Sequence, residues 1–151
     1  GAPLSDGPRH VHCQRLDSEG IQGFVARHDG YAARFGLYHE RELALSANGD
    51  VLEGIDRVNR KDGEVAKANG RDRVTARFHL HPDVQLFENG RGHFVLQGAE
   101  ESWEFSCEEL APQAEESLFF AGLGGPRRSH QIVLTYAASD HPEIHWRLKR
   151  L

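Results

Sequence analysis

Residues 37–58 read LYHERELALSANGDVLEGIDRV, two runs of alternating apolar and polar residues on either side of an Asn-Gly pair. Alternation with a period of two is typical of a half-buried β-strand, and Asn-Gly between two such runs is a strong signal for a β-hairpin. We therefore expect a hairpin closed by Asn48 and Gly49, with Ala47 opposite Asp50. This register decides which side chains share a face, because successive residues of a strand point to opposite sides.

The same pattern recurs along the chain. Short runs of β-branched and aromatic residues, separated by turn residues, predict eleven strands, over residues 10–16, 21–28, 37–45, 51–58, 74–81, 84–88, 93–97, 103–107, 116–120, 131–138 and 145–149. One open sheet of that size would expose long edges and a large apolar face. We therefore expect an all-β fold, a two-sheet antiparallel β-sandwich, with residues 1–151 as a single domain.

Two segments lie outside this pattern. The helix-friendly stretch 107–116 contains Pro112 and has few apolar positions to bury, so we expect a loop or a single turn. The charged insert 59–72 separates two strong strands and is expected to be a mobile surface loop.

The composition excludes several classes of protein. A hydrophobic fraction of 38% is enough for a core and excludes global disorder. No run approaches the ~18–20 apolar residues that cross a bilayer, and a net charge of -5 without a basic run argues against nucleic acid as a partner. Two cysteines, Cys13 and Cys107, are too few for a disulfide scaffold and leave the compartment open between periplasm and cytoplasm.

Histidine is abundant, with ten residues, and the hairpin register places one histidine beside a carboxylate. His39 lies opposite Val58, and Arg41 lies opposite Asp56, so His39 and Asp56 are diagonal neighbours on one face. Diagonal neighbours lie about 7–8 Å apart at the backbone, close enough for both side chains to bind one ion. A cross-strand ion pair between Arg41 and Asp56 is the alternative interpretation.

A third ligand could come from the next strand. There His79 and His81 alternate with Phe78 and Leu80, so the two histidines point to one side of the strand. Three nitrogen and oxygen ligands with one open position suit Zn²⁺, whereas Ca²⁺ and Mg²⁺ favour all-oxygen shells. The spacing therefore points to zinc, with two partly solvated sheet histidines as the alternative.

Five motifs run in order along the chain: VARHDGY at 25–31, RFGLYHEREL at 34–43, GIDR at 54–57, RFHLHPD at 77–83 and GPRRSHQIV at 125–133. Together they resemble the C-terminal β-sandwich region of heparinase II/III-like proteins, and the resemblance covers most of the chain. Complete family members resemble polysaccharide lyases in which an α/α-toroid domain precedes the β region. The resemblance therefore implies an acidic polysaccharide as substrate and the toroid domain of the same protein as partner.

The resemblance also implies roles for particular residues. A metal held in the β region of these lyases maps onto His39, Asp56 and His81 as ligands, for which the donor types favour Zn²⁺. His79 is then a candidate substrate-facing residue. Apart from the resemblance, Arg127 and Arg128 are candidates for binding a sugar carboxylate, because guanidinium groups bind carboxylates bidentately. Two solvated surface arginines are the alternative interpretation.

The implied reaction is a β-elimination, in which a base takes the C5 proton of a uronic acid and an acid protonates the leaving glycosidic oxygen. In the family these groups come largely from the toroid, and some members place a catalytic histidine where this chain has Leu37. His28 and Tyr31 could place an imidazole and a phenol at the cleft, but a strand end followed by an Asp-Gly turn is the preferred interpretation. We expect a metal-binding β-sandwich part of a polysaccharide lyase that is inactive without the toroid. The alternative is a non-catalytic carbohydrate-binding or structural module.

Overall fold

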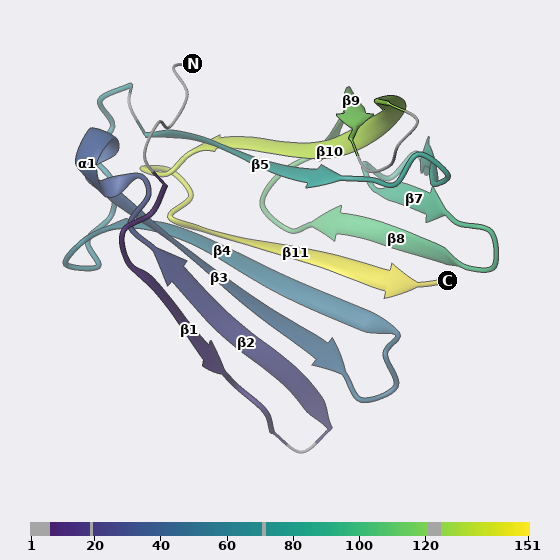
Figure 1. Ribbon diagram of the computed structural model, residues 1–151, viewed down its shortest axis with the longest axis horizontal. Helices are drawn as coiled ribbons and strands as arrows, with labels where there is room; N and C mark the ends of the chain where they lie inside the picture. The colour runs from purple at the N-terminus through teal and green to yellow at the C-terminus, as the bar shows by residue number, and fades with distance from the viewer. Residues whose placement is uncertain (1–6, 19, 71, 121–124) are drawn as a thin grey trace.

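The computed structural model describes residues 7–18, 20–70, 72–120 and 125–151, and their regular structure is almost entirely β (Figure 1). The elements are β1 Val11–Arg15, β2 Ile21–His28, α1 Ala32–Phe35, β3 Leu37–Ser46, β4 Val51–Arg60, β5 Arg73–His79, β6 Gln85–Glu88, β7 Phe94–Gln97, β8 Ser102–Cys107, β9 Gln113–Phe119, β10 Arg127–Ala137 and β11 Glu143–Arg150. Each predicted strand has a counterpart, with bounds that differ by a few residues. None of the described residues forms a helix long and apolar enough to cross a membrane.

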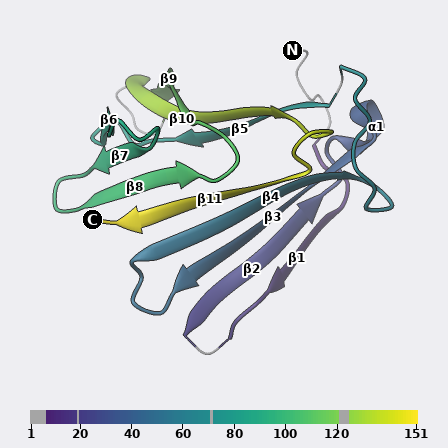
Figure 2. The same ribbon diagram turned by 180° about the vertical axis from the view of Figure 1, so that it is seen from behind.

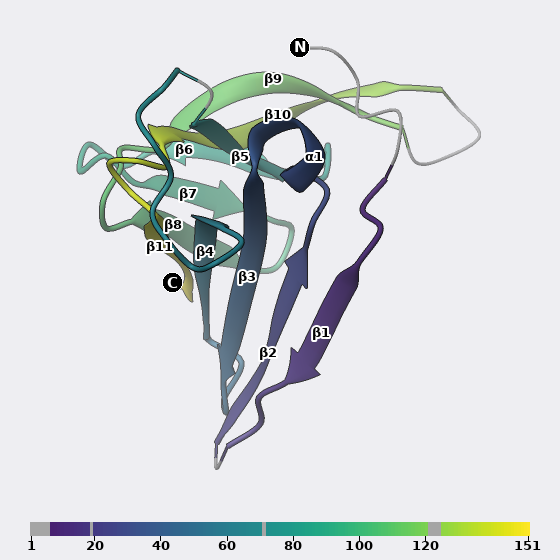
Figure 3. The same cartoon turned by 90° about the vertical axis from the view of Figure 1, so that its left-hand side faces the viewer.

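The strands form two antiparallel sheets. The large sheet has the order β1-β2-β3-β4-β11-β8-β7-β6, and the small sheet has the order β5-β10-β9. The small sheet lies across one face of the large one (Figures 1 and 2), which confirms the predicted β-sandwich. In Figure 3 the strands β1 to β3 run down and away from β9 and β10, so the small sheet covers only part of the large sheet.

The β3–β4 hairpin has the predicted register. Arg41 pairs with Asp56 and His39 with Val58. At the turn Gly49 takes a φ of 74°, a left-handed conformation that suits glycine. The side chain of Asn48 accepts a hydrogen bond from the backbone N–H of Asp50 at 3.2 Å. The turn chemistry therefore fixes the pairing on which the candidate site depends.

The hydrophobic core lies between the two sheets. Its buried members are Phe94, Phe105, Ile132, Leu134, Tyr136, Ile144 and Trp146. Trp146 on β11 lies opposite Gly54 on β4, and a Cβ atom on Gly54 would lie 2.1 Å from the indole ring. The glycine thus makes room for the tryptophan, which brings the indole N–H close to the hairpin's inner face.

The helix α1 was not predicted. It has four residues, and the chain leaves it at Gly36, whose φ of 71° is the left-handed conformation common at helix C-termini. The predicted absence of a long helix in residues 107–116 is correct, since these residues form the end of β8, a loop and the start of β9.

The insert 59–72 contributes to the core, contrary to its description as a surface loop. Ala66 is buried against Leu37 and Val58 at the end of the sandwich. Asp72 is also buried and accepts a hydrogen bond from the Ser139 hydroxyl at 2.6 Å. Lys61, Asp62, Glu64 and Lys67 are exposed, so only part of the segment behaves as its composition predicts.

Candidate functional site

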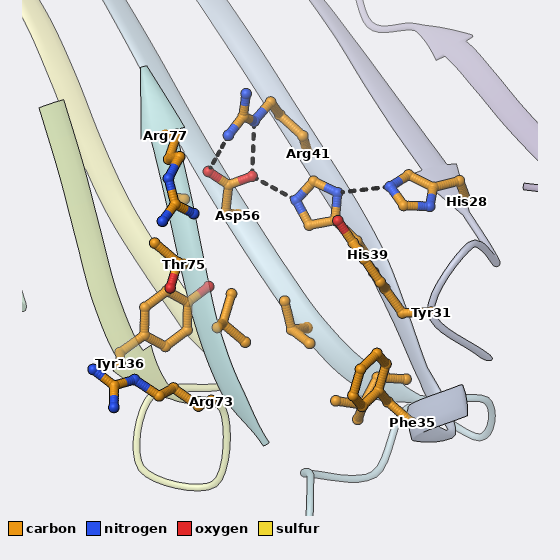
Figure 4. A pocket seen from close by; sticks show the side chains of 14 residues that line it. His28, Tyr31, Phe35, His39, Arg41, Asp56, Arg73, Thr75, Arg77 and Tyr136 are labelled. Carbon is orange, nitrogen blue, oxygen red and sulfur yellow. Dashed lines mark hydrogen bonds and ion pairs between the residues drawn. The ribbon is translucent and has the colours of Figure 1, made fainter. Parts of the chain in front are cut away.

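A cavity of about 430 Å³ opens between the small sheet and the inner face of β2, β3 and β4 (Figure 4). It is lined by His28, Tyr31, Phe35, Leu37, His39, Arg41, Asp56, Val58, Arg73, Val74, Thr75, Ala76, Arg77 and Tyr136. Five consecutive residues of β5, 73–77, are among them, although neighbouring residues of a strand point to opposite sides. The cavity therefore faces the edge of β5, which pairs with β10 alone among the strands of the described residues.

Asp56 is the buried anion of this cavity. Its side chain is 1% exposed and accepts hydrogen bonds from Arg41 Nε and Arg41 Nη2, each at 2.7 Å (Figure 4). His39 Nε2 donates at 2.7 Å, and Trp146 Nε1 donates at 2.9 Å. Burial alone would raise the pKa of Asp56, but the hydrogen bonds from His39 and Arg41 outweigh it and lower the pKa to about 2. Asp56 is therefore ionised at neutral pH.

A chain of hydrogen bonds continues from Asp56 through two imidazoles. The backbone N–H of Gly30 donates to His28 Nδ1 at 3.2 Å, so this nitrogen carries no proton. His28 Nε2 then holds the proton and donates to His39 Nδ1 at 3.2 Å, while His39 Nε2 donates to Asp56. Burial, with His39 as the second cause, lowers the pKa of His28. Both tautomers are fixed, and His28 is neutral at pH 7.

Two phenols add to the cavity wall. The Tyr31 ring lies 5.3 Å from the His28 ring, centroid to centroid. Tyr136 is buried on β10, and burial, together with the nearby charge of Asp56, raises its pKa. The Tyr136 hydroxyl therefore stays protonated at neutral pH.

Arg73 and Arg77 supply cationic groups from β5. Within the described part of the chain neither guanidinium has an ion pair. They are four residues apart on one strand, which places their backbones about 13 Å apart. Both side chains are exposed and share a strand face with His79, so their charge lies at the rim of the cavity. Because Arg41 already neutralises Asp56, this rim has an excess of positive charge that suits an anionic ligand.

The structure places the residues singled out from the sequence in three different regions. His39 and Asp56 come together as the register predicts. His79 bonds Ser117 at 3.0 Å on the outer side of the small sheet, and His81 packs on the Phe119 ring with its own side chain 50% exposed. His79 and His81 do not line the cavity.

The two predicted arginines also lie away from the cavity. Arg127 forms an ion pair with Asp83 at 2.6 Å. Arg128 lines a second cavity of about 840 Å³, between the exposed edges of β6 and β9. Their role in substrate binding stays a prediction, and it would require a second contact region on the opposite part of the sandwich.

The predicted zinc ligands do not form one group. Among the described residues, the three side chains whose donor atoms lie within 4.8 Å of one another are Glu108, Glu109 and His145, on the other face of the large sheet. His81 is separated from Asp56 because Phe78 and Leu80 pack into the core, which turns the histidines of this strand outward. Zinc stays a prediction, and the donor atoms as arranged do not fit it.

Sequence reasoning ranked a place for His28 and Tyr31 at the cleft second to a strand end and turn, and it missed the β5 arginines; both His28 and Tyr31 line the cavity. The antiparallel pairing of β2 with β3 puts His28 directly opposite His39. This pairing could have been inferred by extending the hairpin register to the preceding strand. Arg73 and Arg77 offered a weaker signal, because no local pattern shows which edge of the small sheet faces the hairpin.

The fold and the family are supported by comparison with known proteins. The family described as heparinase II/III-like, C-terminal, matches residues 4–147. A solved heparinase III gene product superposes with a TM-score of 0.67 at 11% identity, over 93% of this chain and 21% of that one. A form of a heparinase III gene product with methylated lysines gives 0.66 at 11%, over 92% and 21%.

No curated protein matches the chain significantly in sequence. At 11% identity the structural likeness shows the fold, and the chain spans about a fifth of the length of the structures that it matches. The family match covers nearly the whole chain, including all five motifs singled out from the sequence. The chain therefore belongs to the heparinase II/III-like family and forms its C-terminal domain.

Proposed function

We propose that this chain is the β-sandwich part of a polysaccharide lyase that acts on uronic-acid polysaccharides, and that its 430 Å³ cavity binds the acidic sugar chain. One observation carries the proposal: the cavity that holds the hydrogen-bonded chain of His28, His39 and Asp56 is bordered at the edge of β5 by two arginines. Arg73 and Arg77 are exposed there, and neither has an ion pair among the described residues. The family match supplies the context.

The two arginines are suited to bind separate anionic groups. Guanidinium groups bind carboxylates through two parallel hydrogen bonds, and both arginines are exposed and accessible to such a ligand. At about 13 Å along β5, the two side chains can contact successive charged groups of an extended polymer. A neutral sugar chain would leave both cations without a counter-charge, so the cavity selects for acidity.

The imidazole chain is suited to handle a proton. His28 is neutral at pH 7 because burial lowers its pKa. Its Nδ1 is the one unprotonated nitrogen of the ring, so accepting a substrate proton there requires release of the hydrogen bond from the Gly30 N–H. Asp56 and His39 position the ring through a continuous chain of hydrogen bonds. The remaining groups of a β-elimination would come from the α/α-toroid domain that the resemblance implies, so this chain alone should not release unsaturated uronates.

Calorimetric titration with an oligouronate tests the proposal. We expect saturable binding to the wild-type chain and no binding of a neutral oligosaccharide of the same length. Arg73→Gln and Arg77→Gln should each lower the affinity at least tenfold, which corresponds to about 1.4 kcal/mol of binding free energy. Arg91→Gln is the matched control, since it removes the same charge from an exposed loop. Equal affinity in all three variants would contradict the proposal.

A non-catalytic carbohydrate-binding module is the second candidate. It is favoured by Leu37, which is buried at the cavity where some relatives carry a catalytic histidine. Absorbance of the unsaturated product separates the two functions. Product formed by the chain together with its toroid domain, and lost in His28→Ala, favours the lyase; tight binding without product under the same conditions favours the module.

A further inference from the structure

The carboxylate of Asp56 has no free position for a metal ion. An ionised carboxylate offers about four lone-pair sites for hydrogen bonds or ligands. Here Oδ1 accepts from Arg41 Nε and His39 Nε2, while Oδ2 accepts from Arg41 Nη2 and Trp146 Nε1. Four donors at 2.7 to 2.9 Å therefore use the whole capacity of this group.

The guanidinium of Arg41 is itself held in place from other directions. Its central carbon lies 5.4 Å from the centroid of the Phe78 ring and 5.5 Å from that of the Trp146 ring. Contacts of this kind between a guanidinium and aromatic faces are favourable, and more so when partly desolvated. The cation is thus fixed by a bidentate ion pair and by two aromatic contacts.

The strand that would supply a third ligand presents Phe78 instead. Phe78 packs against Trp146 at 4.9 Å between ring centroids and contacts Arg41, so its neighbours in sequence face away from the site. Bringing a histidine of this strand to Asp56 would require a shift of one residue, which would also bury a charged side chain in the core.

We infer that Arg41 fulfils the role of the metal cation that the family resemblance implies: it neutralises Asp56 and positions His39 without a metal ion. The inference concerns the cation at this carboxylate and does not depend on the sugar ligand proposed above. The permanent charge of the guanidinium makes the geometry independent of metal supply, since arginine stays protonated at all physiological pH values.

Metal content and thermal unfolding test the inference on the wild-type chain. We expect no stoichiometric zinc after purification without chelator, and the same thermal midpoint in EDTA and in added Zn²⁺. Stoichiometric zinc that is lost in Asp56→Asn, together with a lower midpoint in EDTA, would overturn the inference. Zinc that is lost in Glu109→Gln instead would locate the ion at the group of Glu108, Glu109 and His145 and support it.

An Arg41→His variant provides a second test of the inference if Asp56→Asn unfolds the protein. Residue 41 shares a face with His39, so the variant places two imidazoles and the freed Asp56 carboxylate together, a ligand set that suits Zn²⁺. We expect added zinc to raise the thermal midpoint of Arg41→His and not that of the wild type. An equal rise of the midpoint in both proteins, which persists when Glu109→Gln is added, would show that the guanidinium does not prevent zinc from binding the Asp56 carboxylate. That result would overturn the inference.

Discussion

Replacing Asp56 by asparagine removes the charge that three side chains share while preserving the size of the side chain. The pKa of Asp56 is about 2 in the folded protein against 3.8 ordinarily, and the difference corresponds to about 2.5 kcal/mol of stability at neutral pH. Because the folded-state pKa is depressed, this contribution is present above about pH 5 and is lost as the pH falls through 2.

The variant also leaves the Arg41 guanidinium without its counter-charge. Removing one partner of a buried ion pair costs about 3–5 kcal/mol, and we expect the lower end because the Arg41 side chain is 33% exposed. A loss of about 3 kcal/mol is a large part of the 5–15 kcal/mol typical of a small domain. Asp56→Asn should therefore fold, with a clearly reduced stability.

Urea denaturation followed by tryptophan fluorescence measures this loss. With a typical slope of about 1–3 kcal/mol per molar urea, the midpoint of Asp56→Asn should fall by about 1–3 M at pH 7. The gap from wild type should shrink as the pH approaches 2. Asp83→Asn is the control, because its ion pair with Arg127 lies on the surface and should barely move the midpoint. Equal midpoints at pH 7, or a gap that is the same at both pH values, would refute the reasoning.

Three further outcomes are expected. Gly54→Ala should lower the thermal midpoint and alter Trp146 fluorescence, because the added Cβ would lie 2.1 Å from the indole; an unchanged midpoint and spectrum would be inconsistent with this packing. The hydrogen bond to Glu109 raises the pKa of His145, so the stability it adds is present at low pH and is lost as the pH rises through its folded pKa; in Glu109→Gln an NMR titration should show a lower His145 pKa, and no change would count against the pair. Burial raises the pKa of Cys107 to about 11, so its alkylation at pH 8 should be much slower in the native than in the unfolded chain, and equal rates would argue against burial.

The hairpin shows how much of the site the sequence could predict. The Asn48–Gly49 turn and a period of two were enough to place His39 beside Asp56 and Arg41 opposite it. Both interactions that the register allowed occur at once, since Asp56 has enough lone pairs to accept from both partners. Local periodicity alone could not decide between a metal ion and the guanidinium, because both would lie on the same face.

The residues from the other sheet could not be placed in this way. The alternation of Phe78 with His79 was read correctly, but which of them faces the hairpin depends on how two sheets pack, and the apolar ring takes the buried side. The same long-range packing brings Arg73 and Arg77 to the cavity through the edge of β5. No sequence pattern within β5 predicts that the edge of this strand lies beside the β3–β4 hairpin.

The central claim is that an acidic sugar chain binds in the cavity between β5 and the hairpin, and backbone amide NMR during titration with a uronic-acid tetrasaccharide tests it most directly. We expect the largest shift changes in residues 73–77 and at His28 and His39. Changes confined to the second cavity around Arg128, or no saturable changes at all, would contradict the claim.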